Sequence, residues 1–105
     1  MNQDIIYNVY LMPGMAANPK IFEFIKLPKN LKTHHLEWQM PYKNELISEY
    51  ALRISSSIKG NNIVLIGVSF GGIIIQEISK IIKCKKVIII SSVKSNKELP
   101  LMMQI

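Results

Sequence analysis

The sequence predicts an α/β fold built around a parallel β-sheet. Short runs of β-branched and aromatic residues alternate along the chain with segments whose apolar residues recur at helical spacing. Two of these runs, residues 62–67 and 86–91, are almost wholly apolar, which is typical of strands buried on both faces of a sheet. Such strands separated by helices indicate a four-stranded parallel sheet flanked by helices on both faces, a three-layer αβα arrangement.

The length and composition fit a single domain over residues 1–105. Domains usually hold roughly 100–150 residues. The 105 residues are 49% hydrophobic and 19% charged, which is an ordinary globular composition. This composition excludes a disordered chain, a collagen-like repeat and a coiled coil.

The first part of the chain is predicted to form two strands joined by a short helix. Residues 5–12 are rich in β-branched and aromatic side chains and end at Pro13-Gly14, a pair typical of turns. An asparagine and a proline open the helix predicted for residues 18–25, because asparagine caps helices and proline fits their first position. Residues 32–38 form the second predicted strand.

The second part is predicted to alternate between helices and strands. Apolar side chains in residues 44–58 recur at helical spacing, and Gly60 follows as a stop signal. Residues 62–67 have the length of a buried strand, and residues 70–82 carry isoleucines along one face of another helix. Residues 86–91 form the fourth strand, so the predicted order is βαβαβαβ.

The basic charge of the chain indicates a solvated surface. The net charge is +6, and all but one of the 13 basic residues are lysines scattered along the chain. Proteins that read nucleic acids usually use arginine for paired contacts to bases. We therefore expect neither a nucleic acid nor a membrane as partner. Salt-dependent retention on heparin would support the alternative, a basic module that binds such surfaces.

The sequence also predicts a soluble, cytoplasmic protein without a metal ion. Its longest apolar stretch, Leu65–Ile75, is interrupted by glycines and a serine and is far shorter than the roughly 20 residues of a membrane-spanning helix. Residues 1–17 lack the basic start of a signal peptide. The single cysteine, Cys84, excludes an internal disulfide and gives no support for a zinc site. It is more typical of a small half-buried side chain than of a reactive thiol.

The most specific motif is GVSFGG at residues 67–72. It follows a predicted strand and opens a predicted helix, the context in which Gly-x-Ser-x-Gly forms a nucleophile elbow. The sharp turn is expected to strain the backbone of Ser69 and to project its hydroxyl above the carboxyl edge of the sheet. A Cβ would collide there with a neighbouring strand or helix, so three glycines are expected to be structural: Gly67, Gly71 and Gly72. A dinucleotide-binding fingerprint is excluded, because the middle glycine and the later acidic residue are absent.

The turn after the first strand supplies a candidate for the rest of an oxyanion site. The amide of Phe70 is expected to point where a tetrahedral oxyanion develops, and the amide of Met15 is the candidate second donor. Gly14 allows the backbone to approach closely. Gly14, Met15 and Trp38 are also expected to contact the substrate. Taken alone, the turn is equally consistent with a plain connection between a strand and a helix.

These two motifs resemble the first half of an α/β-hydrolase, over roughly residues 5–93. Residues 5–17 match the family's oxyanion loop, which commonly has His-Gly where this chain has Pro-Gly, and residues 67–72 match its nucleophile elbow. The resemblance implies the sheet order second, first, third, fourth strand, with a ligand crevice between the first and third. It also implies a serine hydrolase that acts through Ser69 on a carboxylic ester or thioester and needs no cofactor or metal. The apolar surroundings of Ser69 indicate an apolar acyl group.

The resemblance leaves the catalytic triad incomplete. In the family the acid and the histidine follow the serine, but after Ser69 this chain offers Glu77 and Glu98 and no histidine. His34 and His35 precede the elbow and are expected early in their strand, on opposite faces. We therefore expect the 105 residues to be the amino-terminal half of a longer serine hydrolase, a truncated form inactive by itself.

A second hypothesis is a non-catalytic scaffold of the same fold. The fourth strand would lie at an open edge of the sheet, and an open edge can pair with another chain. This hypothesis expects a homodimer, or binding through that edge, that is unaffected by Ser69→Ala.

Overall fold

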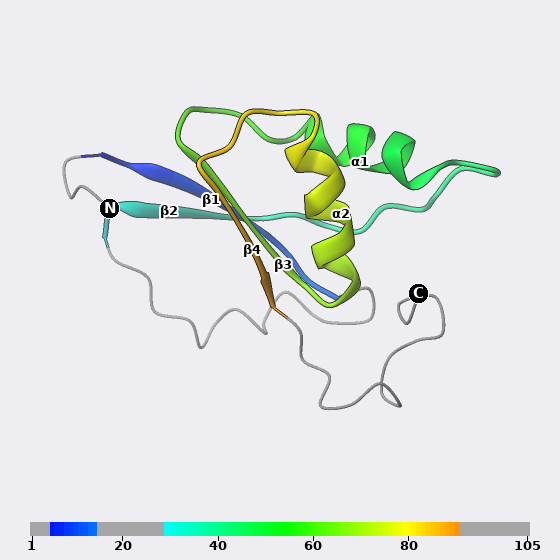
Figure 1. Ribbon diagram of the computed structural model, residues 1–105, viewed down its shortest axis with the longest axis horizontal. Helices are drawn as coiled ribbons and strands as arrows, with labels where there is room; N and C mark the ends of the chain where they lie inside the picture. The colour runs from blue at the N-terminus through cyan, green and yellow to red at the C-terminus, as the bar shows by residue number, and fades with distance from the viewer. Residues whose placement is uncertain (1–4, 15–28, 91–105) are drawn as a thin grey trace.

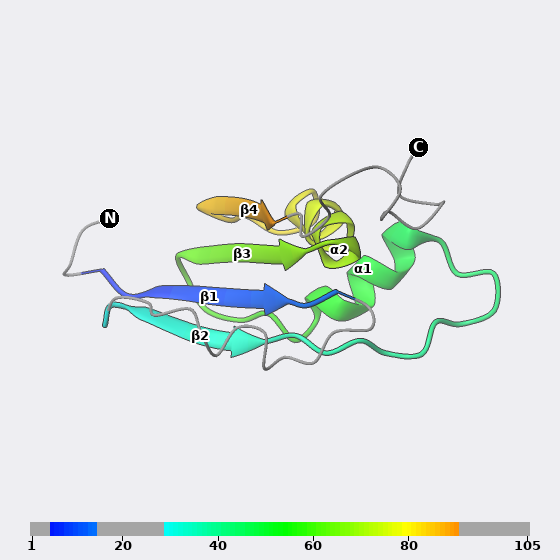
Figure 2. The ribbon, with the colours of Figure 1, turned by 90° about the horizontal axis from the view of Figure 1, so that it is seen from below.

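Four runs of β-branched and apolar residues form one parallel sheet. The computed structural model describes residues 5–14 and 29–90. The strands are β1 (Tyr7–Met12), β2 (Leu31–His35), β3 (Ile63–Val68) and β4 (Lys86–Ile90). All three neighbouring pairs are parallel, in the order β2-β1-β3-β4 (Figure 2). The strand order that the sequence resemblance implies is confirmed, and the chain direction across the sheet reverses between β1 and β3.

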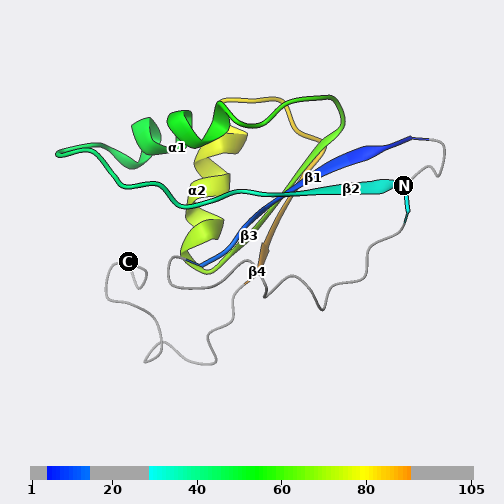
Figure 3. The same ribbon diagram turned by 180° about the vertical axis from the view of Figure 1, so that it is seen from behind.

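Two helices, α1 (Ile47–Ser55) and α2 (Phe70–Ser79), cover the same face of this sheet (Figures 1 and 3). Their buried side chains meet those of β1 and β3 in one core, and the largest of them include Met12, Ile54, Leu65, Ile74 and Ile78. The helical spacing of apolar residues in the sequence therefore matches the spacing of the buried side chains. Within residues 5–14 and 29–90, neither helix is long and apolar enough to cross a membrane.

Both helices are shorter than predicted. Asn44 has φ of +61°, a left-handed conformation that excludes it from a helix, so α1 begins only at Ile47. After Ser55, the amides of the next residues bond to carbonyls three positions back instead of four, which tightens the chain into a turn. The amide of Lys80 does the same at the end of α2.

The opposite face of the sheet is also apolar and buried. It carries Val9 and Leu11 from β1 together with Val64, Ile66 and Val68 from β3. The burial of both faces explains why β3 is apolar throughout its length. The predicted helix at residues 18–25 lies outside the described residues, so the structure supports an α/β fold with two helices on one face, and the three-layer arrangement stays a prediction.

Strand β2 ends at His35, three residues before the predicted boundary at residue 38. The register pairs Leu11 with His35, and the amide of Leu36 still bonds to the carbonyl of Leu11. The next positions of β1 are Met12 and then Pro13, which has no N–H to continue a ladder. The chain after β2 therefore leaves the sheet and runs on toward the elbow.

Candidate active site

Ser69 stands at the junction of β3 and α2 in a strained backbone conformation. Its φ is +54° and its ψ is −122°, a region that residues with a side chain rarely adopt. Its amide donates to the carbonyl of Ile90 at 2.9 Å, and its carbonyl accepts from the amide of Gly72 at 2.9 Å. These bonds tie the turn to the end of β4 and to the first turn of α2. The strain expected from the sequence is present.

Two of the three glycines around Ser69 are required by close backbone contacts. A Cβ on Gly67 would lie 2.5 Å from the carbonyl oxygen of Gly71. A Cβ on Gly71 would lie 2.6 Å from the carbonyl oxygens of both Met12 and Pro13. At Gly72 the nearest atom belongs to a side chain, Cγ2 of Ile89 at 2.7 Å. The start of α2 is thus packed directly against β3 and against the end of β1.

The turn after β1 lies beside the elbow, as the sequence predicts. Pro13 and Gly14 are buried, and the carbonyl of Pro13 accepts a 3.0 Å hydrogen bond from the indole N–H of Trp38. The predicted second amide, that of Met15, lies outside the described residues. Its role as an oxyanion donor stays a prediction, as does contact of Gly14 and Met15 with a substrate.

Phe70 combines two roles at the start of α2. As the first residue of the helix, it has an amide that no carbonyl within the helix can accept. Its ring lies against the indole of Trp38, with the two centroids 5.6 Å apart. The role of its amide as an oxyanion donor stays a prediction, and its side chain forms part of an adjoining cavity.

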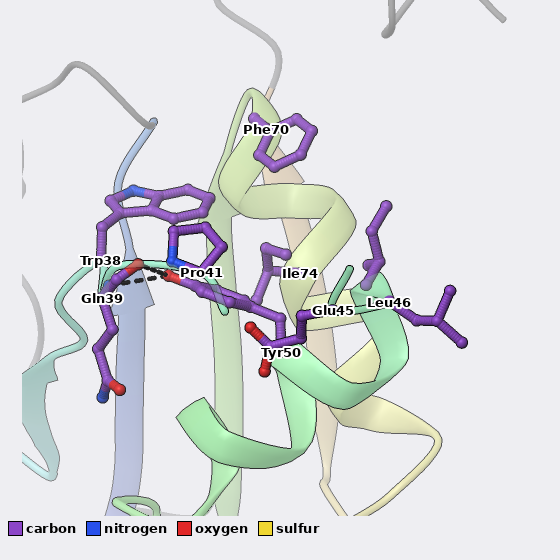
Figure 4. Close-up of a pocket in the computed structure, with 9 residues that line it drawn as sticks. Trp38, Gln39, Pro41, Glu45, Leu46, Tyr50, Phe70 and Ile74 are labelled. Atoms are coloured by element: carbon purple, nitrogen blue, oxygen red, sulfur yellow. Dashed lines mark hydrogen bonds between the residues drawn. The ribbon is translucent and has the colours of Figure 1, made fainter. Parts of the chain in front are cut away.

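This cavity of about 260 Å³, here called the acyl-side pocket, lies between the starts of the two helices and the segment that follows β2 (Figure 4). It is lined by Trp38, Gln39, Pro41, Glu45, Leu46, Ile47, Tyr50, Phe70 and Ile74. Phe70 and Ile74 are one helical turn apart on α2, so the pocket begins at the residue that follows Ser69. Sequence reasoning found Trp38 and Phe70 but missed the rest, because the spacing of Tyr50 and Ile74 indicates only a buried helix face.

Arg53 holds the wall of the acyl-side pocket in place. Its guanidinium donates to both carboxylate oxygens of Glu45, at 2.6 and 2.8 Å. It also donates to the side chain of Gln39 at 3.0 Å and to the carbonyl of Met40 at 3.1 Å, and it lies 3.9 Å from the ring centroid of Tyr42. The segment from residue 39 to residue 45 is thus attached to α1 through Arg53 as well as through the hydroxyl of Tyr50. The signal that could have revealed it is that Arg53 is the single arginine of the chain.

The opposite charges of Glu45 and Arg53 neutralise each other in the pocket wall. The side chain of Glu45 is only 5% exposed. The hydrogen bond from Arg53 lowers the pKa of Glu45 and raises that of Arg53 itself. The hydroxyl of Tyr50 is used as well, because it accepts from the amide of Gln39 at 2.8 Å and donates to its carbonyl at 2.9 Å.

The two histidines do not approach Ser69. His34 is stacked on Tyr10 with 4.5 Å between ring centroids, and its Nε2 lies 3.1 Å from Oδ1 of Asn8. Tyr10 is level with Leu65, so a rise of about 3.3 Å per residue places His34 roughly 13 Å below Ser69 along the sheet. His35 is next in the strand and belongs to the opposite face. Both end β2 instead of lying early in it, because the strand is shorter than predicted.

The first acidic residue after the elbow is also remote, and the second, Glu98, lies outside the described residues. Glu77 lies in the last turn of α2 and forms a 3.1 Å ion pair with Lys80. Within residues 5–14 and 29–90, no group of three potential metal-ligating side chains occurs.

Comparisons with models of known families, with curated proteins and with solved structures give no significant match to this chain. The site is therefore defined by its geometry alone.

Proposed function

We propose that Ser69 is the nucleophile of a serine hydrolase that acts on a carboxylic ester or thioester. The observation that carries this proposal is a serine with positive φ between a buried parallel strand and a helix. Such strain persists only where the surrounding structure imposes it, and Gly67 and Gly71 on either side of Ser69 are packed closely against backbone atoms. The turn places Ser69 at the positive end of α2, where developing negative charge is stabilised.

The proposed reaction proceeds in two balanced steps. The Oγ of Ser69 attacks the carbonyl carbon, its proton passes to a base, and the alcohol or thiol leaves with a proton. Water then cleaves the acyl-serine to a carboxylic acid and restores the hydroxyl. The amide of Phe70 stabilises the oxyanion in both steps, with the amide of Met15 as the proposed second donor.

This chain supplies no histidine base at the elbow among its described residues, so the test provides one. The chain is treated with a fluorophosphonate, with and without imidazole, and the modified peptide is identified by mass spectrometry. We expect imidazole to accelerate modification of Ser69 by about tenfold or more, because general bases typically contribute at least that much. Ser69→Ala should remove the acceleration. Ser56→Ala, which removes an exposed hydroxyl at the end of α1, should leave it unchanged.

Modification spread over the exposed serines, or an unchanged yield in Ser69→Ala, would contradict the proposal. Steady ester turnover by the chain without imidazole, lost in Ser69→Ala, would support the nucleophile. It would also show that a base is present in the chain after all.

The second candidate is a binding scaffold, and the position of β4 favours it. Among the described strands β4 pairs only with β3, and Ile89 and Ile90 are 46% and 38% exposed. An apolar edge strand can extend a sheet into a second copy of the chain. Sedimentation over a range of concentrations tests this candidate: a dimer of unchanged stability in Ser69→Ala supports it, and a monomer at every concentration contradicts it.

A further inference from the structure

We infer that the acyl-side pocket binds the unbranched alkyl chain of the substrate's acyl group. The inference rests on the proposed function of Ser69 and adds the chemical class of its substrate. It would make the protein selective for aliphatic acyl esters or thioesters over short, charged or highly polar ones. The residues that determine this selectivity are Trp38, Leu46, Tyr50 and Ile74.

The position of the pocket connects it to the reacting atoms. Phe70 follows Ser69 directly in the chain and lines the pocket. The indole of Trp38 lies against Phe70 on one side and donates to the carbonyl of Pro13 on the other. The pocket therefore adjoins both the elbow and the turn after β1, the two parts of the proposed oxyanion site.

Most polar side-chain atoms that line the pocket already have partners. The Trp38 N–H is bonded to Pro13, and the hydroxyl of Tyr50 is bonded twice to the backbone of Gln39. The side chains of Gln39 and Glu45 accept from Arg53. A polar occupant would lose its hydration without gaining these groups as partners. An alkyl chain loses nothing by leaving water, and each buried methylene tightens binding roughly fourfold.

The size of the pocket agrees with a simple chain. Its volume of about 260 Å³ is slightly below the usual range for drug-sized ligands, roughly 300–1,000 Å³. Its lining includes the aromatic rings of Trp38 and Tyr50 and the branched side chains of Leu46 and Ile74 (Figure 4). A flexible chain fits such a space more readily than a fused ring system.

The test is a binding titration that needs no catalysis. Trp38 is the single tryptophan of the chain and lines the pocket, so its fluorescence reports occupancy. The full chain carrying Ser69→Ala is titrated with butanoate, hexanoate, octanoate and decanoate, each below its micelle-forming concentration. We expect Kd to fall roughly fourfold per added methylene until the pocket is full, and then to level off.

Two variants connect this binding to the pocket. Ile74→Phe fills it and should weaken octanoate binding at least tenfold. Because Ile74 is 1% exposed and the larger ring could impair folding, Leu46→Asp provides a second variant. Leu46 is 64% exposed and precedes the first residue of α1, where aspartate favours the helix but adds a charge to the pocket. Matched changes at Leu52, exposed on α1 outside the pocket, should leave Kd unchanged.

The outcomes separate the inference from the proposed function. A Kd that does not depend on chain length, or equal effects of Leu46→Asp and Leu52→Asp, would overturn the inference whether or not Ser69 reacts with a fluorophosphonate. Length-dependent binding in the pocket together with an unreactive Ser69 would support an apolar ligand site and overturn the hydrolase.

Discussion

Helices α1 and α2 lie side by side on one face of the sheet, yet their first turns are built differently. Leu46, the residue that precedes α1, has an ordinary extended backbone. Its amide donates a 2.9 Å hydrogen bond to the carboxylate of Glu49. The first turn of α2 contains no acidic residue, and Ser69 before it is strained and makes no side-chain cap. One helix start places a carboxylate at its own positive end, whereas the first turn of the other holds none.

This comparison shows that the start of α1 adds to the stability of the fold, whereas the start of α2 lowers it. A carboxylate in the first turn contributes about 0.3–1 kcal/mol to a helix. The start of α2 lacks that contribution and carries the strain of Ser69, roughly 1–3 kcal/mol, in addition. Ser69 therefore lowers stability in two ways, and it lies between two structural glycines. A role in function is the simplest reason for such a loss of stability.

The largest effect is expected where α2 touches β1. In Gly71→Ala the new Cβ would lie 2.6 Å from two backbone carbonyl oxygens, which cannot move without displacing the end of β1. We expect the free energy of unfolding, measured in urea, to fall by about 3 kcal/mol, the upper part of the usual cost of overpacking. Gly72→Ala is the matched control, because its Cβ would meet a methyl group of Ile89 at 2.7 Å, while the nearest backbone atom is 3.7 Å away.

For Gly72→Ala we expect a change of about 1 kcal/mol or less, since alanine is also favoured over glycine inside a helix. Equal losses in the two variants would mean that backbone contact between α2 and β1 does not hold the elbow together.

A smaller effect of opposite sign is expected at Ser69. Glycine adopts positive φ without strain, so Ser69→Gly should raise the free energy of unfolding by about 1 kcal/mol above that of Ser69→Ala. Both variants lack the hydroxyl and should lose fluorophosphonate modification equally. A Ser69→Gly chain no more stable than Ser69→Ala would remove strain from the description of the elbow.

The elbow could be predicted because its signal is local, whereas the strand order was expected only from the resemblance that the two motifs carry. The spacing of Gly67, Ser69 and Gly71 between an apolar run and a helical period leaves few conformations for the turn. The end of β2 could also have been found, because it depends on Pro13, once β1 and β2 are placed side by side. The nucleophilic role of Ser69 stays a prediction at every stage.

The acyl-side pocket could not be predicted, because it depends on partners that are far apart in sequence. Tyr50 was expected as part of a buried helix face, and it is buried, but its hydroxyl bonds to Gln39 eleven residues earlier. Arg53 could be singled out as the one arginine, but only the fold shows that it binds Glu45. Hydrophobic spacing predicts that a side chain is buried and says nothing about which groups meet there.

The capped start of α1 is expected to show a modest effect. Glu49→Gln keeps a hydrogen-bonding side chain but removes the charge that faces the helix dipole. We expect the free energy of unfolding to fall by about 0.5 kcal/mol in low salt and by less in high salt. Glu37→Gln removes a charge from an exposed residue outside both helices and serves as the control. A loss that salt does not diminish would indicate that the cap acts through hydrogen bonding alone.

The smallest effect expected is the pH dependence of stability that the ion pair between Glu45 and Arg53 produces. The hydrogen bond from Arg53 lowers the pKa of Glu45 below its ordinary value of 4.5. Because the pKa is lower in the folded chain, the ionised carboxylate favours folding, and this contribution is complete above about pH 4.5. It disappears as the pH falls through the lower value of the folded state.

The stability difference between the unmodified chain and Glu45→Gln should therefore shrink with acidification, and the titration of the Glu45 carboxyl by NMR should show a depressed midpoint. Arg53→Lys retains the charge but loses the planar fork that reaches both carboxylate oxygens, so it should return that midpoint toward the ordinary value. It should also weaken octanoate binding, since the wall at residues 39–45 is then held to α1 mainly by the Tyr50 hydroxyl. If the midpoint moves while octanoate binding does not change, the ion pair of Arg53 and Glu45 does not shape the pocket, and its attachment to α1 serves stability only.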